Sequence, residues 1–344
     1  MKKYLSLAFA FMLVLGMSFP ALMADAYFEE DSKKENIIKT ELSDTSLSDE
    51  AISFLAENNI SLDSKVTPNS EVMSEGNGNT EYIGVLNEEI LALKNAAQAY
   101  GFTQQQIQAY VEGILNTPTT VIFEEDNPDL SIMSNPTSTR VPDDGIGYEV
   151  QSLTGYSQAT SYVTLPTRSI NNLNDIAYLF YTAYSSSTCM DFGVRGGMYS
   201  WVTSFNPVKN PKEDGVAIGK NDGDRVYINI SVASDGWLSC KIMDANNFSN
   251  VLCSVLYQMT GVKKDSMVFN KQISLCNNYA TYTSGSSISH AKFNQSYLYN
   301  SKGYSLMNSS NTNSKRRGAF GGSRVTVNSY TQWDSEDVSI YFNS

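Results

Sequence analysis

The stretch that decides the fold is R-V-Y-I-N-I-S-V-A-S-D-G-W-L-S-C-K-I-M-D, residues 225–244. Apolar and polar residues alternate on both sides of the Ser-Asp-Gly sequence at 234–236, a pattern typical of two strands joined by a tight turn. A two-residue turn would place the apolar residues of one strand beside the polar residues of the other. A three-residue turn with Gly236 in the left-handed conformation instead places Val232 opposite Leu238. The sequence therefore predicts this turn and a β-bulge beside it.

The opposite face of this predicted hairpin mixes aromatic rings with amide, hydroxyl and ammonium groups. Flat rings can stack on the C–H faces of sugars, and short polar side chains can reach sugar hydroxyls. We therefore predict a face that binds carbohydrate, while an ordinary sheet face covered by solvent or by a loop is the alternative. The candidate ligand-binding residues are Tyr227, Asn229, Ser231, Trp237, Ser239 and Lys241.

The same two-residue period continues through the C-terminal part of the chain, from Tyr148 onward. Short runs recur between clusters of Gly, Asn, Asp and Ser, and no helical period is long enough for a β-α-β unit. The pattern predicts a mainly-β fold, an antiparallel β-sandwich of the jelly-roll or concanavalin-like kind, with a barrel as the alternative. The expected strands are 158–165, 176–184, 190–195, 198–204, 225–233, 237–243, 251–257, 266–275, 324–330 and 337–343.

A second stretch, D-F-G-V-R-G-G-M-Y-S-W at 191–201, contains a D-F-G triplet and a glycine pair that could mark a phosphate-handling loop. A kinase would also need a phosphate-binding lysine strand and an H-R-D loop, and the sequence contains neither. We interpret the stretch as another hairpin, in which Gly196 and Gly197 form a two-residue turn and Phe192 faces Trp201.

The span 177–257, which holds both predicted hairpins, resembles secreted β-sandwiches of the concanavalin-type lectin and glucanase class. It also resembles the uncharacterised YrpD-like secreted proteins of Gram-positive bacteria. The segments that carry the resemblance are D-F-G-V-R-G-G-M-Y-S-W and I-N-I-S-V-A-S-D-G-W. The resemblance covers about half of the β region and implies a sandwich fold. The paired catalytic acids of the glucanases match no positions in this sequence, so it implies no catalytic residues.

The charge of the chain is divided unevenly. Residues 27–146 contain 22 acidic and 6 basic side chains, whereas residues 147–344 contain 13 acidic and 16 basic ones. The whole chain carries a net charge of −12 at pH 7, which argues against nucleic acid as a partner. The asymmetry predicts two regions with different roles. The acidic region is either a helical spacer or a pro-segment that covers the weakly basic region.

The acidic region is predicted to be partly disordered and partly helical. Ser48 is suited to cap a short helix, and Asn87 is suited to cap a second helix that ends at Gly101. Thr103 begins a T-x-x-Q capping box and with it a third helix. The predicted organisation is a signal peptide at 1–26, an acidic, partly disordered helical region at 27–118, a linker at 119–147 and a β-sandwich domain at 148–344.

The first 26 residues have the composition of a secretory signal peptide. Lys2 and Lys3 precede an apolar run, residues 5–17, that is too short to span a membrane. Ala24-Asp25-Ala26 fits the A-x-A cleavage pattern. We therefore expect an extracellular protein that is secreted through this peptide and keeps no transmembrane segment after cleavage.

No set of residues matches a known catalytic or metal-binding pattern. His290 is the only histidine, and the serines before it lack the G-x-S-x-G sequence of a nucleophile elbow. Asn221–Asp224 lack the later glutamate of an EF-hand loop. Glu336 and Asp337 are expected to point to opposite faces of a strand, which makes them a poor pair for glycoside hydrolysis. Lys315–Arg317 are expected in a solvated loop. We predict no cofactor and no metal.

Four cysteines in an exported chain allow three disulfide pairings. Cys240 and Cys253 lie symmetrically about Asn246-Asn247, so a hairpin centred there would make them direct cross-strand partners within disulfide range. We predict a disulfide between Cys240 and Cys253, or a close thiol pair where the compartment does not oxidise it. Cys189 and Cys276 would then form the second pair. Four separate buried thiols are the alternative.

These observations favour a secreted, non-catalytic binding module with polysaccharide or cell wall as its ligand. The alternative is a secreted hydrolase or lyase with an acidic N-terminal pro-segment, which the uneven charge motivates. A purely structural surface protein is a third hypothesis. The sequence assigns no catalytic residue to any of them.

Overall fold

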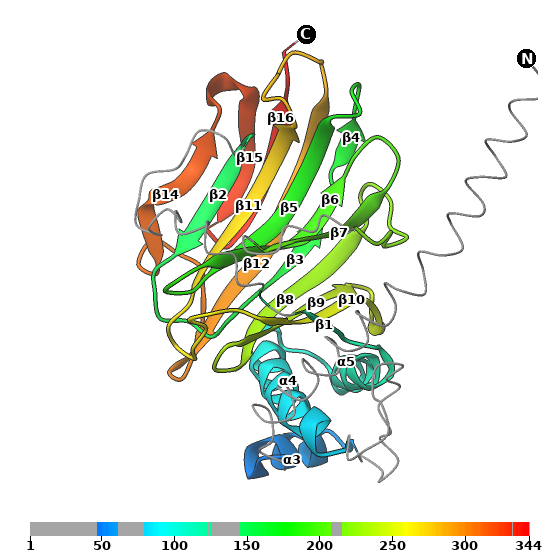
Figure 1. The fold of residues 1–344 in the computed structure, drawn as a ribbon, viewed down its shortest axis with the longest axis vertical. Helices are drawn as coiled ribbons and strands as arrows, with labels where there is room; N and C mark the ends of the chain where they lie inside the picture. The colour runs from blue at the N-terminus through cyan, green and yellow to red at the C-terminus, as the bar shows by residue number, and fades with distance from the viewer. Residues whose placement is uncertain are drawn as a thin grey trace, which may run out of the picture.

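Two β-sheets packed face to face form the body of the protein, and three helices lie at one end beside the larger sheet (Figure 1). The computed structural model describes residues 47–60, 79–122, 124, 145–207, 215–331 and 333–343. The predicted signal peptide and most of the predicted linker lie outside these residues. The predicted fold class, a mainly-β antiparallel sandwich preceded by a small helical region, is confirmed.

The larger sheet has ten strands in the described part of the chain, in the order β1-β10-β9-β8-β3-β12-β16-β15, with β4 and β13 also paired to β12. Strand β1 lies inside the predicted linker and pairs in parallel with β10. The bounds are β1 Thr120–Ile122, β3 Gln158–Thr164, β4 Thr167–Ser169, β8 Arg225–Ser234, β9 Trp237–Asp244, β10 Asn247–Gln258, β12 Ser287–Asn300, β13 Gly303–Leu306, β15 Val325–Thr331 and β16 Ser335–Tyr341.

The smaller sheet is antiparallel throughout its described strands and has the order β14-β2-β11-β5-β6-β7. Its edge strand β14 and the edge strand β15 of the larger sheet lie on the same side of the sandwich (Figure 1). The bounds are β2 Ile146–Ser152, β5 Asp175–Tyr184, β6 Cys189–Gly196, β7 Trp201–Pro207, β11 Val268–Asn277 and β14 Thr312–Phe320; a 3-10 turn at Gly322–Arg324 precedes β15.

The core lies between the sheets and follows from the alternation in the sequence. Ile228 and Ile230 of β8 point inward and meet inward side chains of the smaller sheet such as Leu179 and Phe192, and all four are fully buried. Removing one such side chain from water stabilises the fold by about 1.5–3 kcal/mol. Because inward and outward residues alternate, the polar residues between them are presented on the outer faces of both sheets.

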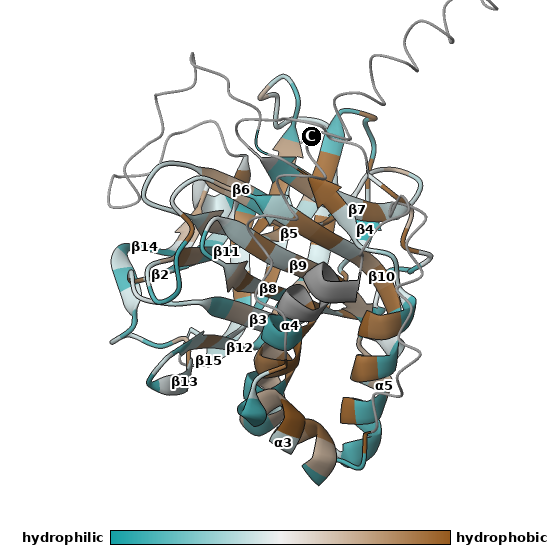
Figure 2. Ribbon diagram, turned by 60° about the horizontal axis from the view of Figure 1, so that its bottom comes forward, coloured by the Kyte–Doolittle hydropathy of each residue, from teal (hydrophilic) through white to brown (hydrophobic). Residues whose placement is uncertain are grey.

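Two helices, α4 Asn79–Tyr100 and α5 Gln104–Asn116, cover part of the outer face of the larger sheet, and α3 Asp49–Glu57 packs against α4. Figure 2 shows hydrophobic residues alternating with hydrophilic ones along α5, as expected for a helix with one buried side. The buried helix residues form one apolar cluster with four residues of the sheet, Tyr162, Tyr227, Met243 and Phe248. The helical region and the sandwich therefore share a core.

The predicted caps of α3 and α5 are confirmed. Ser48 Oγ accepts a hydrogen bond from the first turn of α3, and the capping box that begins at Thr103 is formed in both directions. Gly101, with φ 64°, follows the end of α4 as predicted. The predicted cap at Asn87 is wrong, because α4 begins earlier. Asn87 Oδ1 instead accepts the backbone N–H of Ser48 at 2.8 Å and ties α3 to α4.

Thr103→Ala is expected to lower the free energy of unfolding by about 1 kcal/mol. The reason is that the backbone N–H of Gln106 loses its acceptor, the Thr103 hydroxyl. Denaturant unfolding of the variant and of Thr326→Ala, an exposed threonine on β15, provides the comparison. Equal stability of the two variants would show that the box does not stabilise α5.

The hairpin of β8 and β9 has the predicted pairing. Val232 lies opposite Leu238, a register shift follows directly, and Gly236 has φ 85°. The turn is one residue shorter than predicted, because Ser234 pairs with Trp237 and only Asp235-Gly236 connect the strands. The bulge in β8 restores the register that keeps the apolar residues of both strands on one face.

The predicted geometry of the β6–β7 hairpin is wrong. Gly196 pairs with Trp201 and Phe192 pairs with Phe205, so residues 197–200 make the connection. Neither predicted turn glycine has a positive φ. A Cβ at Gly196 would lie 2.7 Å from both the Trp201 ring and the Arg168 guanidinium. This glycine therefore permits a close approach of side chains rather than a tight turn.

The longest described strand, β12, was not among the strands expected from the sequence. Two of its residues, His290 and Gln295, have φ near +60° and +52°. Register shifts against β16 and β3 occur at these two places. The bulges break the alternation of apolar and polar residues, which is the signal that identifies strands in a sequence.

The predicted register, which would place Cys240 directly opposite Cys253 across β9 and β10, is also wrong. Cys240 lies opposite Val255 and Cys253 lies opposite Ile242, because β10 carries two register shifts after the turn. The two thiols are therefore diagonal neighbours, and burial is the main cause that raises the pKa of the Cys240 thiol, with a smaller contribution from nearby Cys253. All four cysteines, Cys189 and Cys276 included, are free thiols in the structure.

A helix that crosses a bilayer must be both long and apolar. None of the described helices combines sufficient length with sufficient apolar character to cross a bilayer.

Candidate functional site

The six residues predicted to bind a ligand lie on one face of β8 and β9, as predicted, but that face is covered. All six are at most 5% exposed. Figure 1 shows α4 and α5 next to β8, β9 and β10. Other parts of the same chain therefore cover these side chains, and an external ligand has no access to them. The covered residues are Tyr227, Asn229, Ser231, Trp237, Ser239 and Lys241.

An ion pair between Lys241 and Glu89 anchors α4 to this face. Lys241 Nζ donates to Glu89 Oε1 and also to Ser254 Oγ at 3.0 Å and Ser239 Oγ at 3.3 Å. Both charged side chains are buried, with exposures of 2% and 7%. The three protons of the ammonium group thus have three acceptors, which is the condition for burying a charge at acceptable cost.

Other predicted residues contact the helices through hydrogen bonds and rings. Asn229 Nδ2 donates to the hydroxyl of Tyr110 on α5 at 3.1 Å. The ring of Tyr227 packs against Tyr110 and Tyr100, with centroid distances of 6.2 and 5.8 Å. Trp237 lies farther along the sheet, in a small buried cluster beside β1. The mixed aromatic and polar composition that suggested sugar binding therefore serves intramolecular docking.

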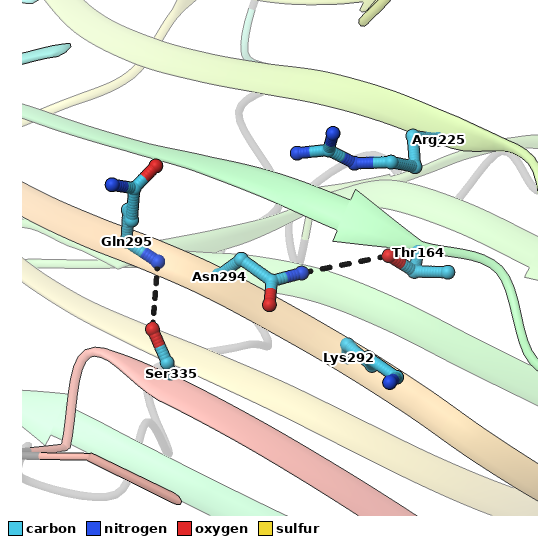
Figure 3. Close-up of a pocket in the computed structure, with 6 residues that line it drawn as sticks. All are labelled: Thr164, Arg225, Lys292, Asn294, Gln295 and Ser335. Atoms are coloured by element: carbon cyan, nitrogen blue, oxygen red, sulfur yellow. Dashed lines mark hydrogen bonds between the residues drawn. The ribbon is translucent and has the colours of Figure 1, made fainter.

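Beyond the helices, the outer face of the larger sheet stays uncovered and holds a shallow pocket of about 430 Å³. Figure 3 shows its side chains arriving from four neighbouring strands, β8, β3, β12 and β16. Within it the Asn294 amide donates to Thr164 Oγ1 at 3.5 Å, and the backbone N–H of Gln295 donates to Ser335 Oγ at 3.0 Å. The lining residues are Thr164, Arg225, Lys292, Asn294, Gln295 and Ser335.

Two cations line this pocket, and they differ in their partners. Lys292 Nζ lies 3.0 Å from Asp337 Oδ2, and the His290 ring lies 3.1 Å from the same carboxylate. Although burial opposes ionisation, hydrogen bonds from Asn328, Lys292 and His290 hold the pKa of Asp337 below its usual value. The charge of Lys292 is thereby balanced at neutral pH.

Arg225 is exposed, and its guanidinium lies over the ring of Tyr162 at 4.8 Å from the centroid. Among the described residues, no carboxylate lies within ion-pair distance of it. A guanidinium that lies over a ring keeps N–H groups that can bind a carboxylate or phosphate in a bidentate manner. Arg225 therefore differs from Lys292, since no carboxylate among the described residues balances its charge.

The pocket lies against the end of α4. The hydroxyl of Tyr100, the last residue of the helix, donates to the carbonyl of Gln295 at 2.7 Å. Gln295 is the bulged residue of β12, so the helix end and the bulge hold each other in place. Sequence reasoning missed this site because four of the six lining residues, three on β12 and one at the start of β16, lie outside the strands expected from the sequence.

The remaining candidates from the sequence are dispersed. Asn221–Asp224 form a turn, with the backbone N–H of Asn221 donating to Asp224. Glu336 and Asp337 do point to opposite faces of β16, as predicted. The basic cluster is not in a solvated loop: it lies on β14, where Arg316 is buried and makes a bidentate pair with Glu149 at 2.8 Å. In the described residues, no three His, Cys, Asp or Glu side chains gather as metal ligands.

This chain is similar to several solved structures, all at low sequence identity. No family model matches the sequence, and no curated protein matches it. SCP-B, a member of the eqolisin family of peptidases solved with the tripeptide Ala-Ile-His, is similar with a TM-score of 0.43 and 9% identity, covering 57% of this chain and 98% of that one. Scytalido-glutamic peptidase with a peptide-based transition-state analogue has a TM-score of 0.39 at 7% identity, with the same coverage.

A functionally unknown protein from Saccharomyces cerevisiae is also similar, with a TM-score of 0.26 and 9% identity over 57% of this chain and 70% of that one. At such values no activity, substrate or residue role is carried over from any of these structures.

Proposed function

We propose that the protein is an exported binding module that holds an acidic polysaccharide in the pocket beside α4. The observation that carries the proposal is the exposed guanidinium of Arg225, stacked on Tyr162 without an acidic partner in the described structure, next to amide and hydroxyl groups from three neighbouring strands. A sugar chain with carboxylates presents what these groups bind: an anion for the arginine and hydroxyls for Asn294, Gln295 and Thr164.

The shape of the site also suits a polymer better than a small molecule. The pocket is shallow and crosses four strands, and adjacent strands are about 4.8 Å apart. Three such spacings give about 14 Å, enough for a short stretch of a chain laid across the sheet. A small ligand would gain little in a pocket that covers so little of its surface.

Retention on insoluble polymers tests the proposal. The full chain is expected to be retained on an insoluble polyuronate and on Gram-positive cell walls, and much less on cellulose. Retention on the acidic polymers is expected to fall as salt rises, because an exposed charge pair is screened within about 10 Å at 0.1 M salt. Equal retention on cellulose, or no retention on any polymer, would rule out this function.

Arg225→Ala is expected to weaken binding to a soluble polyuronate about tenfold. One charge-assisted hydrogen-bonded contact is worth about 1.5 kcal/mol or more, and about 1.4 kcal/mol corresponds to a factor of ten. Titration calorimetry measures the change. Lys302→Ala is the matched control, since it removes an exposed cation from the β12–β13 turn, away from the pocket residues. If both variants bind equally, the pocket is not the site.

The hydrolase with an acidic pro-segment remains a second candidate, and one observation favours it. Two ion pairs dock the acidic helical region on the sandwich. Glu89 pairs with Lys241, and Glu88 Oε2 lies 2.7 Å from Lys264 Nζ. A pro-segment would be removed after export, so the mass of the exported chain decides. An intact chain from Tyr27 onward argues for the binding module, and loss of the helical region argues for the pro-segment.

A further inference from the structure

A buried amine and a buried carboxyl meet between the two sheets. Lys271 of β11 points inward between Phe269 and Ile273, where the alternation of the strand calls for an apolar side chain. Glu336 of β16 points inward from the opposite sheet. Lys271 Nζ lies 2.6 Å from Glu336 Oε2, and the two side chains are only 2% and 1% exposed. Sequence positions 65 residues apart are thus brought together across the sandwich.

The surroundings of this pair disfavour charge on both partners. The ring of Phe293 lies 5.7 Å from Lys271 Nζ. Burial, the largest cause in each case, lowers the pKa of Lys271 and raises the pKa of Glu336 to about 7, although the mutual attraction of the pair opposes both shifts. The neutral amine and the neutral carboxylic acid are therefore accessible forms, and a desolvated neutral lysine is a nucleophile.

A second acid and unpaired oxygens lie beside the pair. Asp334 is close enough that its charge raises the pKa of both Lys271 and Glu336. Three oxygens here are buried without a hydrogen-bond partner: Glu336 Oε1, Asp334 Oδ1 and the hydroxyl of Tyr148. Buried polar atoms are normally satisfied, so three such atoms in one place require an explanation.

We propose that Lys271 and Glu336 condense after folding into an intramolecular isopeptide bond, a covalent link between the two sheets. The lone pair of Nζ attacks the carboxyl carbon of Glu336. One proton of the nitrogen passes to the departing hydroxyl, which leaves as water. One N–C bond forms, one C–O bond breaks, and one water molecule is released, so the step needs no oxidant, reductant or further reactant.

The reaction removes the cost of the buried ion pair. The desolvation free energy of a buried ion pair is offset only when its geometry is excellent and further hydrogen bonds satisfy both groups. Lys271 has only two acceptors among the described residues, Glu336 and Ser296 Oγ at 2.9 Å, and one oxygen of Glu336 has no donor. A neutral amide in the same place carries no charge, and it keeps the sheets together when the pair would otherwise separate.

The other buried lysine shows the contrast. Lys241 has three acceptors for its three protons, two of them serine hydroxyls, so its ammonium form is fully satisfied. We therefore expect Lys241 and Glu89 to remain an ion pair, which makes this pair an internal control.

The mass of the folded, purified full chain tests the proposal without any variant. The mass is expected to be lower than that of the sequence from its observed N-terminus by one water molecule. After digestion, tandem mass spectrometry is expected to find the peptide with Lys271 joined to the peptide with Glu336. An unmodified mass would overturn the proposal. So would a water loss that maps to any other position, including Lys241.

Two variants separate chemistry from folding. Lys271→Arg is expected to restore the full mass, whereas Lys241→Arg is expected to keep the water loss. Asp334→Asn keeps the size of the side chain and removes the charge that favours the neutral acid form of Glu336, so the linked fraction measured at a fixed time after refolding is expected to fall severalfold. Unchanged linkage in Asp334→Asn would overturn the assigned role of Asp334. Unchanged linkage in Lys271→Arg would overturn the cross-link itself.

Discussion

Replacing Lys241 with methionine is expected to lower the free energy of unfolding by about 3–5 kcal/mol. The side chain of Glu89 would stay buried under α4 without its cation, and Ser239 and Ser254 would lose the group that donates to them. A buried carboxylate without a partner must either be solvated, which opens the contact between helix and sheet, or be protonated. Denaturant unfolding at pH 7 measures the loss.

Two further variants make this prediction specific. Lys94→Met removes a similar ion pair, Lys94 with Glu50 at 2.8 Å, but the side chains are 24% and 62% exposed, so a change below about 1 kcal/mol is expected. Adding Glu89→Leu to Lys241→Met removes both buried charges, and most of the lost stability is expected to return. A loss in Lys241→Met no larger than in Lys94→Met would mean that the helices are not held in this way.

Tyr227→Ala is expected to cost about 3–5 kcal/mol, as for other large aromatic side chains removed from a core. The Tyr227 ring is fully buried where α4 and α5 meet the sheet. The ring centroids of Tyr227 and Phe248 lie 5.4 Å apart. The Tyr227 ring also packs against Tyr100 of α4 and Tyr110 of α5. Thermal unfolding followed by circular dichroism measures the change.

Tyr199→Ala is the control for this variant. Tyr199 is 82% exposed in the β6–β7 connection, so its removal is expected to change stability by less than about 0.5 kcal/mol. If Tyr227→Ala destabilised the sandwich but left the helices folded, or the reverse, the two parts would not share a core. A single cooperative transition at a lower temperature is the expected result.

Local patterns in the sequence were sufficient for features that local contacts decide. The alternation at 225–244 predicted which residues of β8 and β9 face each other, and the T-x-x-Q sequence predicted the capping box at Thr103. In both cases the partners are close in the chain, so the sequence contains the whole interaction. The predicted cap at Asn87 failed because a tertiary contact with Ser48 uses that side chain instead.

The candidate site depended on contacts that no local pattern contains. The aromatic and polar face of β8 and β9 was identified correctly as a face, but the sequence does not show that Glu89, 152 residues before Lys241, lies on it. The uncovered pocket needs the bulge at Gln295 to bring β12 residues beside Arg225. The buried Lys271–Glu336 pair was missed because one charged residue in an apolar alternation gives no signal of its partner.

The acidic helical region docks on part of the outer face of the larger sheet, and α4 ends where the pocket begins. Tyr100 marks that boundary, since it packs against Tyr227 on the covered side and bonds to Gln295 on the open side. The helices thereby define one edge of the pocket, and the end of α4 supports the bulge at Gln295.

Hydrogen–deuterium exchange with and without a soluble polyuronate tests most directly where the ligand binds. The account predicts slower exchange on addition of the polymer in the peptides that cover Thr164, Arg225 and residues 292–295, around the pocket. It predicts no change at β5 and β6 on the opposite sheet. Protection centred on β5 and β6, or no protection anywhere at saturating polymer, would contradict it.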